Sequence, residues 1–146
     1  MNSPDKPPID LAARCACGAV ELRLNGRVRS MFLCSCEDCQ RSTGTGHATV
    51  ALVAIDDLEV AGATRSFARP AHSGATLTRW FCPVCGTPLH ARSSRAEALA
   101  LVPVGLFAGA AGWFAPSQLI FARSHHEWDL VDPALPRHDT YREPTE

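Results

Sequence analysis

Seven cysteines in three short clusters are the residues of this chain whose type and spacing could do chemistry. The clusters follow the patterns C-x-C, C-x-C-x-x-C and C-x-x-C, and their members are Cys15, Cys17, Cys34, Cys36, Cys39, Cys82 and Cys85. Because the number is odd, the cysteines cannot all pair in disulfides within one chain. Cysteines one or two residues apart can instead reach one zinc ion, which prefers a tetrahedral shell of ligands. The clusters therefore predict metal sites, and the seven ligands divide into four and three.

The first and last clusters together predict a closed zinc site. Cys82-Pro83-Val84-Cys85-Gly86 has the sequence of a zinc knuckle, in which the turn points backbone amides toward sulfur and the glycine permits the unusual dihedral that follows. Such a turn supplies two ligands, and Cys15-Ala16-Cys17-Gly18 supplies two more. Four thiolates leave no position for substrate, so this zinc would be structural. The alternative is two unrelated pairs of free thiols.

The middle cluster, Cys34-Ser35-Cys36-Glu37-Asp38-Cys39, predicts a site of a different kind. Three thiolates leave a tetrahedral zinc one ligand short, and a catalytic zinc keeps such an open position for water or substrate. Two alternatives remain open. A histidine could close the shell, with His47, His72 and His90 as candidates, or the cysteines could cycle between dithiol and disulfide. The chain lacks the βαβ pattern of a thioredoxin-like fold, which argues against the redox alternative.

The elements that must position these cysteines are predicted to be mainly strands. Val20–Leu24 alternates apolar and polar residues, and Asn25-Gly26 follows as a hairpin turn signal before a partner strand over 28–33. Thr76–Phe81 alternates in the same way and leads directly into the last cluster. Further strands are expected over residues 48–55, 87–91, 98–107 and 119–121. One short helix is expected from Glu37 to about Thr43, so the predicted fold class is mostly β.

Composition and charge exclude several classes of partner. The 146 residues, 46% hydrophobic and 20% charged, suit a single globular domain. With 14 Lys and Arg against 15 Asp and Glu the chain has no sustained basic patch, so we expect no nucleic acid and no membrane as partner. The uncharged stretch 98–115 is interrupted by Pro103 and by glycines, which argues against a membrane span. Residues 1–10 contain no apolar segment, so we expect no secretory signal and a cytoplasmic location, where thiols stay reduced.

Prolines and polar residues at both ends predict three regions. These are a flexible N-terminal extension over residues 1–12, a zinc-binding domain over residues 13–131, and a proline-rich C-terminal tail over residues 132–146. The sequence leaves open whether the chain forms a homo-oligomer.

The order of the three clusters resembles one enzyme family. C-x-C-G, C-x-C-x-x-C-Q-R-x-x-G and R-W-F-C-x-x-C-G-T-P-L follow one another as in the glutathione-dependent formaldehyde-activating enzyme family, which includes centromere protein V. The resemblance extends from about Cys15 to Trp128 and implies the Mss4-like fold, a mostly β assembly of small antiparallel sheets around zinc. It also implies two zinc ions per chain. The ligands would be Cys15, Cys17, Cys82 and Cys85 at a structural zinc, and Cys34, Cys36 and Cys39 at an active zinc.

The resemblance further implies an enzyme that joins a thiol such as glutathione to a small aldehyde such as formaldehyde. The product is S-hydroxymethylglutathione, and the reverse reaction is a carbon–sulfur lyase step. Two positions depart from the family pattern: Ser35 stands where many members have histidine, and Gly105-Leu106-Phe107-Ala108 stands where many read G-T-L-D. Both departures leave the zinc ligands intact. The alternative function is a non-catalytic, zinc-stabilised binding module, because the protein that gives the fold its name is an interaction protein.

Five charged residues are candidates for contacts with substrate. Glu37 or Asp38 could relay a proton, against the alternative of solvated carboxylates at the start of a helix. Forked hydrogen bonds to the carboxylates of glutathione are predicted for Arg41, Arg69 and Arg79, against the alternative of ordinary surface arginines.

The remaining conspicuous side chains are given no role in the chemistry. Trp80 and Trp128 are predicted to be core residues. The pair His125-His126 is left unassigned as a metal site, because adjacent residues on a strand face opposite ways.

Overall fold

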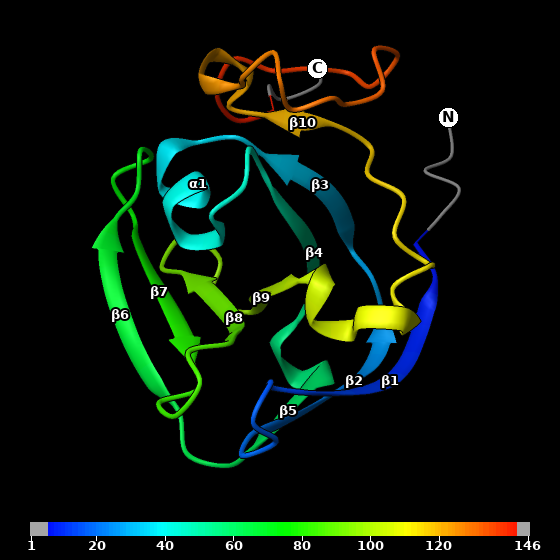
Figure 1. Ribbon diagram of the computed structural model, residues 1–146, viewed down its shortest axis with the longest axis vertical. Helices are drawn as coiled ribbons and strands as arrows, with labels where there is room; N and C mark the ends of the chain where they lie inside the picture. Colours follow the sequence, from blue (N-terminus) through cyan, green and yellow to red (C-terminus); the bar gives the residue numbers. More distant parts are fainter. Residues whose placement is uncertain (1–5, 143–146) are drawn as a thin grey trace. The chain divides into compact units, whose positions relative to one another are not determined.

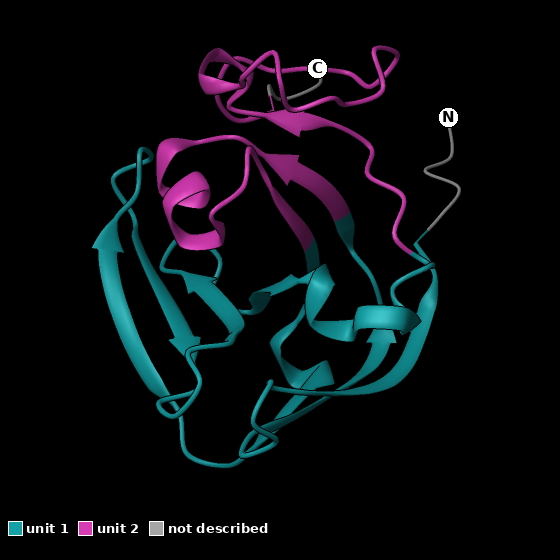
Figure 2. Cartoon of the chain, in the orientation of Figure 1, with its two compact units in different colours: residues 1–30, 51–113 teal, residues 31–50, 114–146 magenta. Residues whose placement is uncertain are grey.

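The structure, a computed structural model, describes residues 6–142. Within that range the chain forms ten strands in two sheets, one α-helix and three short 3₁₀ helices (Figure 1), so the mostly β prediction is confirmed. The chain divides into two compact units, of which unit 1 comprises residues 1–30 and 51–113 and unit 2 comprises residues 31–50 and 114–146 (Figure 2).

The first sheet of unit 1 has the strand order β1 (Pro8–Arg14), β2 (Glu21–Arg27) and β5 (Leu58–Ala61), all antiparallel. Alternation along β2 places Leu22 and Leu24 in the core, where both are almost fully buried. The predicted hairpin turn at Asn25-Gly26 is wrong, because both residues lie within β2 and pair with β1. Residues 21–27 continue as one strand through the expected turn and pair with residues 8–14 of β1. The partner of β2 on this side is therefore β1, not residues 28–33.

The other strands of unit 1 follow one another along the chain as an antiparallel ladder. They are β6 (Arg65–Pro70), β7 (Thr76–Phe81), β8 (Pro88–Ser93) and β9 (Leu99–Pro103). The turn between β7 and β8 contains the last cysteine cluster. The strand predicted over 98–107 ends early, because Pro103 has no N–H to donate and the chain continues as a 3₁₀ helix over Val104–Ala110.

Unit 2 contains most of β3 (Ser30–Cys34), the helix α1 (Glu37–Thr43), the start of β4 (Ala48–Ala54) and β10 (Leu119–Ile120). The short β10 runs parallel to the end of β3. The helix prediction is confirmed at both ends. A cluster of Cys34, Ile120 and Phe121, with Phe32 and Tyr141 packed against it, gives unit 2 a core directly beside the middle cysteine cluster.

The ends of the chain differ from the expected extensions. β1 begins at Pro8 and buries Ile9, so residues 8–12 belong to the sheet rather than to a flexible extension. Residues 1–5 and 143–146 lie outside the described range. In the expected tail, the backbone carbonyls of Pro136, His138 and Thr140 accept hydrogen bonds from residues 119–122. The domain boundaries themselves stay a prediction.

The uncharged stretch over residues 98–115 is the part of the sequence that raised the question of a membrane span. Within residues 6–142, no helix combines the length and the hydropathy needed to cross a bilayer.

Candidate metal centres

Two turns in unit 1 bring together the sulfur atoms of the four-cysteine site, which consists of Cys15, Cys17, Cys82 and Cys85. All four atoms lie within 4.8 Å of one another. The Cys15–Cys17 and Cys17–Cys82 sulfur distances are 3.6 and 3.7 Å. Tetrahedral zinc with bonds of about 2.3 Å to sulfur requires separations of about 3.8 Å. The donor atoms therefore fit a tetrahedral metal ion as the chain stands.

The local fold explains why these turns point their sulfur atoms inward. Gly86 adopts a φ of +78° and its N–H donates to the Cys82 carbonyl at 2.9 Å, which closes the knuckle as the sequence predicted. Backbone N–H groups then donate to sulfur: Val20 to Cys15 at 3.2 Å and Val84 to Cys82 at 3.4 Å. Such bonds stabilise the thiolate form that metal ligands need.

Thr87 is a residue of this site that the sequence reasoning missed as a contributor. Its hydroxyl oxygen accepts a hydrogen bond from the Ala16 N–H at 3.1 Å, which leaves the hydroxyl hydrogen for the Cys85 sulfur, also at 3.1 Å. This bond from Thr87 is the main reason that the pKa of the Cys85 thiol is lowered to about 5. A threonine directly after the knuckle glycine was the available signal.

Cys17 shows the opposite shift in the same cluster. The Ala19 N–H acts to lower the pKa of the Cys17 thiol, but burial and hydrogen bonds from Cys15, Cys82 and Cys85 outweigh it and raise that pKa to about 11. A thiol with a raised pKa must lose its proton to become a metal ligand, so metal binding at this site releases the Cys17 proton.

The three-cysteine loop consists of Cys34, Cys36 and Cys39 and lies in unit 2. Cys34 ends β3, Cys36 is the N-cap of α1, and Cys39 lies in the first turn of the helix. Their sulfur atoms lie within 4.8 Å of one another, and the Cys36 sulfur accepts the Cys39 N–H at 3.3 Å. Hydrogen bonds with Cys36 and Cys39, and then burial, raise the pKa of the Cys34 thiol above its usual range. Three sulfurs this close favour a shared cation.

No histidine closes the shell of the three-cysteine loop in this structure. Among the described residues, no His, Asp or Glu joins the three sulfurs as a fourth member of the group. His47, the candidate in the same unit, is hydrogen-bonded through Nδ1 to the Asp129 carboxylate at 2.5 Å. His72 and His90 belong to unit 1, where His90 stacks on Trp80 with ring centroids 4.7 Å apart.

Ser35 holds the middle of the three-cysteine loop, at the position where the family pattern often has histidine. The residue is fully buried, and its N–H donates to the Ile120 carbonyl at 3.0 Å. Its own carbonyl accepts a hydrogen bond from the Gln40 side chain at 2.9 Å. Burial of Ser35 turns the residue toward the core of unit 2 and leaves its neighbours to supply the sulfurs.

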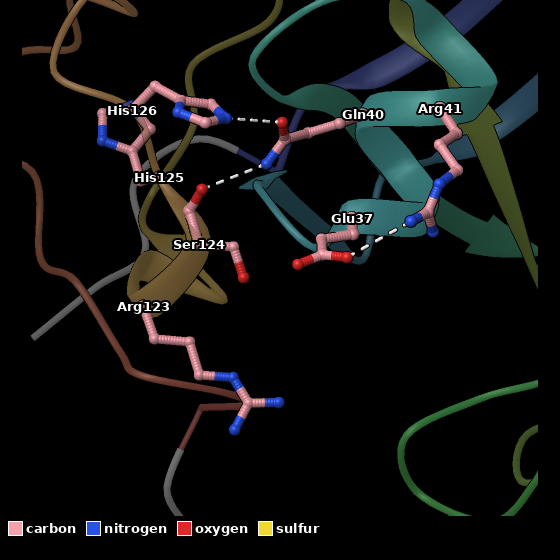
Figure 3. A pocket seen from close by; sticks show the side chains of 7 residues that line it. All are labelled: Glu37, Gln40, Arg41, Arg123, Ser124, His125 and His126. Atoms are coloured by element: carbon pink, nitrogen blue, oxygen red, sulfur yellow. Dashed lines mark hydrogen bonds and ion pairs between the residues drawn. The ribbon is translucent and has the colours of Figure 1, made fainter.

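A cavity of about 550 Å³ lies in unit 2, lined by α1 and by residues 123–126 (Figure 3). It is lined by Glu37, Gln40, Arg41, Arg123, Ser124, His125 and His126. Arg41 pairs with Glu37 at 3.3 Å and with Asp38 at 3.6 Å, whereas the Arg123 guanidinium extends into the open space. These ion pairs are exposed, and a proton relay through either carboxylate stays a prediction.

The histidine pair beside the cavity is divided between two partners. His125 Nε2 donates to Asp129 at 3.1 Å, while His126 Nε2 donates to the Gln40 side-chain oxygen at 2.9 Å. His126 also stacks on Trp128, with ring centroids 5.0 Å apart. Trp128 is 67% exposed, so its prediction as a core residue is wrong.

The remaining predicted side chains lie in unit 1. Trp80 is half-buried on β7, with the Arg92 guanidinium 5.8 Å from its ring centre. Arg69 on β6 and Arg79 on β7 are the other arginines assigned to substrate, and that assignment stays a prediction.

The fold and the cysteine geometry together define a mostly β protein with two clusters that could hold metal ions. The family model described as glutathione-dependent formaldehyde-activating enzyme matches residues 10–124, which is more than half of the chain. The chain belongs to this family, as the order of its cysteine clusters predicted.

A solved structure supports the fold. The crystal structure of a Rhodobacter sphaeroides protein, 24% identical, aligns with a TM-score of 0.55 over 68% of this chain and 90% of that chain. No curated protein matches the chain. Family membership indicates, in general terms, a formaldehyde-activating function related to glutathione.

Proposed function

We propose that the chain is a zinc-dependent carbon–sulfur lyase of the S-hydroxymethylglutathione synthase type, acting on a small aldehyde and a thiol such as glutathione. The observation that carries the proposal is the convergence of three sulfur atoms on the three-cysteine loop without a fourth His, Asp or Glu among the described residues. A tetrahedral ion held by three protein ligands keeps one position for substrate.

The chain's own residues have distinct tasks in this proposal. Cys34, Cys36 and Cys39 hold one zinc ion at the active site, and Cys15, Cys17, Cys82 and Cys85 hold a second, structural ion. Zinc bound at the three-cysteine loop would deprotonate a coordinated thiol, whose pKa is otherwise near 8.5. The Cys39 N–H supports the Cys36 sulfur as a thiolate.

The reaction balances without an oxidant or a reductant. The thiol sulfur forms a bond to the aldehyde carbon, the thiol loses its proton, and the aldehyde oxygen takes up one proton. The reverse reaction breaks the same carbon–sulfur bond. The proposal therefore needs a bound thiol, a bound aldehyde and a route for one proton.

We assign a carboxylate of the thiol substrate to the cavity beside α1. Of the three arginines predicted for this role, Arg41 lines the cavity, and Arg123 adds a second guanidinium there. Arg41 is already paired with two carboxylates, whereas the Arg123 guanidinium lies over the Phe121 ring, 5.7 Å from the ring centre. A guanidinium that faces open space suits a forked bond to a carboxylate.

The alternative is a non-catalytic binding module stabilised by zinc. Two exposed apolar residues close together in sequence, Trp128 at 67% and Leu130 at 90% exposure, favour this candidate, because such side chains commonly contact partner proteins. In that case the three-cysteine loop would need no vacant ligand position.

Metal stoichiometry and catalysis together test the proposal. Reduced, freshly purified protein is expected to contain two zinc ions per chain, one of which a mild chelator removes. Exchange spectroscopy on glutathione and formaldehyde should then show acceleration that Cys36→Ser abolishes and that Ala134→Ser, an exposed change in unit 2, retains. One tightly held ion, with Cys34, Cys36 and Cys39 open to alkylation and no acceleration, would support the binding module instead.

A further inference from the structure

Gln40 is a side chain of α1 that makes three hydrogen bonds to other parts of unit 2. Its Nε2 donates to the Ser35 carbonyl at 2.9 Å and to the Ser124 carbonyl at 3.1 Å, and its Oε1 accepts from His126 Nε2 at 2.9 Å. We propose that Gln40 is the positioning residue of the three-cysteine loop, which it holds in a metal-binding geometry and links to the cavity. This inference rests on the proposed function, because it assumes that the loop holds a metal ion.

The bond to Ser35 acts on the loop at its most constrained point. Ser35 lies between Cys34 and Cys36, so fixing its carbonyl fixes the peptide that joins two of the sulfur-bearing residues. The Ser35 N–H is held from the other side by Ile120 on β10. With both backbone groups bonded and the side chain buried, the loop has little freedom to turn its sulfurs apart.

The other two bonds orient the Gln40 amide itself. The carbonyls of Ser35 and Ser124 require the amide nitrogen on their side. The amide oxygen then faces His126, as the His126 N–H requires; Figure 3 shows the bonds to Ser124 and His126. His126 is in turn stacked on Trp128. The amide therefore cannot rotate without losing hydrogen bonds. A displacement of His126 at the cavity would move Gln40, and through Gln40 the Ser35 carbonyl in the three-cysteine loop.

The expected size of the effect follows from the role of outer-shell partners in metal sites. Groups that orient ligands without touching the metal typically contribute about 10- to 100-fold in metal affinity. Gln40 is such a group, because its three bonds go to two backbone carbonyls and one imidazole. The four-cysteine site lies in unit 1 and shares none of these bonds, so each chain carries its own control.

Gln40→Glu isolates the donor function. It preserves the shape of the side chain and the acceptor for His126, but replaces the N–H donors with an oxygen that faces two carbonyls. Ala134→Glu is the matched control, since it adds the same charge to unit 2 at an exposed position. Co²⁺ and Zn²⁺ are the probes, with affinity measured by chelator competition and coordination geometry by the cobalt absorption spectrum.

We expect Gln40→Glu to lower the metal affinity of the three-cysteine loop by about 10- to 100-fold and to change the cobalt spectrum of that site. The four-cysteine site should keep its affinity for metal, and Ala134→Glu should match the wild type at both sites. Should Gln40→Glu fail to fold, His126→Phe removes one of the three bonds while keeping a ring to stack on Trp128. It should lower the affinity by a smaller factor.

The outcomes distinguish the role of Gln40 from the proposed function. A wild-type chain that binds two ions, with Gln40→Glu and His126→Phe binding both equally well and with an unchanged cobalt spectrum, overturns the role of Gln40 alone. A wild-type chain that binds a single ion in excess metal overturns the proposed function, and the positioning role with it.

Discussion

The hydroxyl of Thr87 joins the two cysteine-bearing turns of the four-cysteine site, because it bonds to Ala16 in one and to Cys85 in the other. Thr87→Val keeps the shape of the side chain but removes both the acceptor for Ala16 and the donor to Cys85. We expect the pKa of the Cys85 thiol to rise above its value of about 5, because its largest stabilising bond is lost. Metal affinity at this site should fall by about 10- to 100-fold. The pH profile of Cys85 alkylation in metal-free protein measures the first effect, and an unchanged profile would contradict it.

His90 predicts a pH dependence of stability in unit 1. Burial, and then the charge of Arg92, lower the pKa of this imidazole below 6.5, and its Nδ1 is buried with no hydrogen-bond partner in the structure. The unfolded chain therefore binds the proton more tightly than the folded chain does. Neutral His90 therefore contributes fully to the stability of the fold above the pKa that the imidazole has in the unfolded chain. That contribution is lost as the pH falls through the pKa of His90 in the folded chain.

His90→Phe should remove this contribution, because a phenyl ring can still stack on Trp80 but cannot bind a proton. Urea unfolding of both proteins between about pH 7 and pH 5 tests the prediction. The wild type is expected to lose more stability than the variant over that interval. Acid effects on the cysteines cancel in the comparison, so parallel curves would show that His90 does not titrate as the structure implies.

At the scale of elements, α1 depends on how its seven residues are ended. Gly44 adopts a φ of +74° and its N–H donates to the Gln40 carbonyl at 2.8 Å, so it closes the helix that carries Cys39. Gly44→Ala should cost about 1–2 kcal/mol, because a side chain is unfavourable in this backbone conformation. An added Cβ would meet no atom within 4 Å, so the loss reports the backbone alone.

Gly112→Ala provides the control for this prediction in urea unfolding. Gly112 also has open space around it but has no positive φ, and its replacement should change stability by less than about 0.5 kcal/mol. Equal effects of the two substitutions would mean that the end of α1 does not limit stability.

The elements also separate what the sequence could predict from what it could not. Local patterns were sufficient for α1, for the strand that leads into Cys82, and for the division of the cysteines into four and three. β1 was missed because prolines begin it and its apolar alternation is weak. Gln40 could not be found from spacing, since its partners Ser124 and His126 lie more than 80 positions away in the sequence.

At the scale of the whole molecule, each compact unit contains one candidate metal site, the four-cysteine site in unit 1 and the three-cysteine loop in unit 2. Metal loss from the two clusters should therefore be separable, and the C-terminal segment offers a way to affect one without the other. Residues 136–141 pack within unit 2 against the segment that neighbours the three-cysteine loop. Pro136 and Thr140 accept backbone bonds from Leu119 and Phe121 at 2.9 Å, and the Tyr141 ring packs edge-on against Phe121.

Deleting residues 132–146 should remove these contacts and expose Phe121, which packs in the same cluster as Cys34. We expect a mild chelator to remove metal from the three-cysteine loop faster, while the four-cysteine site keeps its ion at the wild-type rate. Ala134→Ser, an exposed change within the deleted segment, is the control and should leave both rates unchanged. If the long deletion accelerates loss from both sites equally, the two clusters depend on one cooperative fold, because a defect confined to unit 2 would then have spread to unit 1.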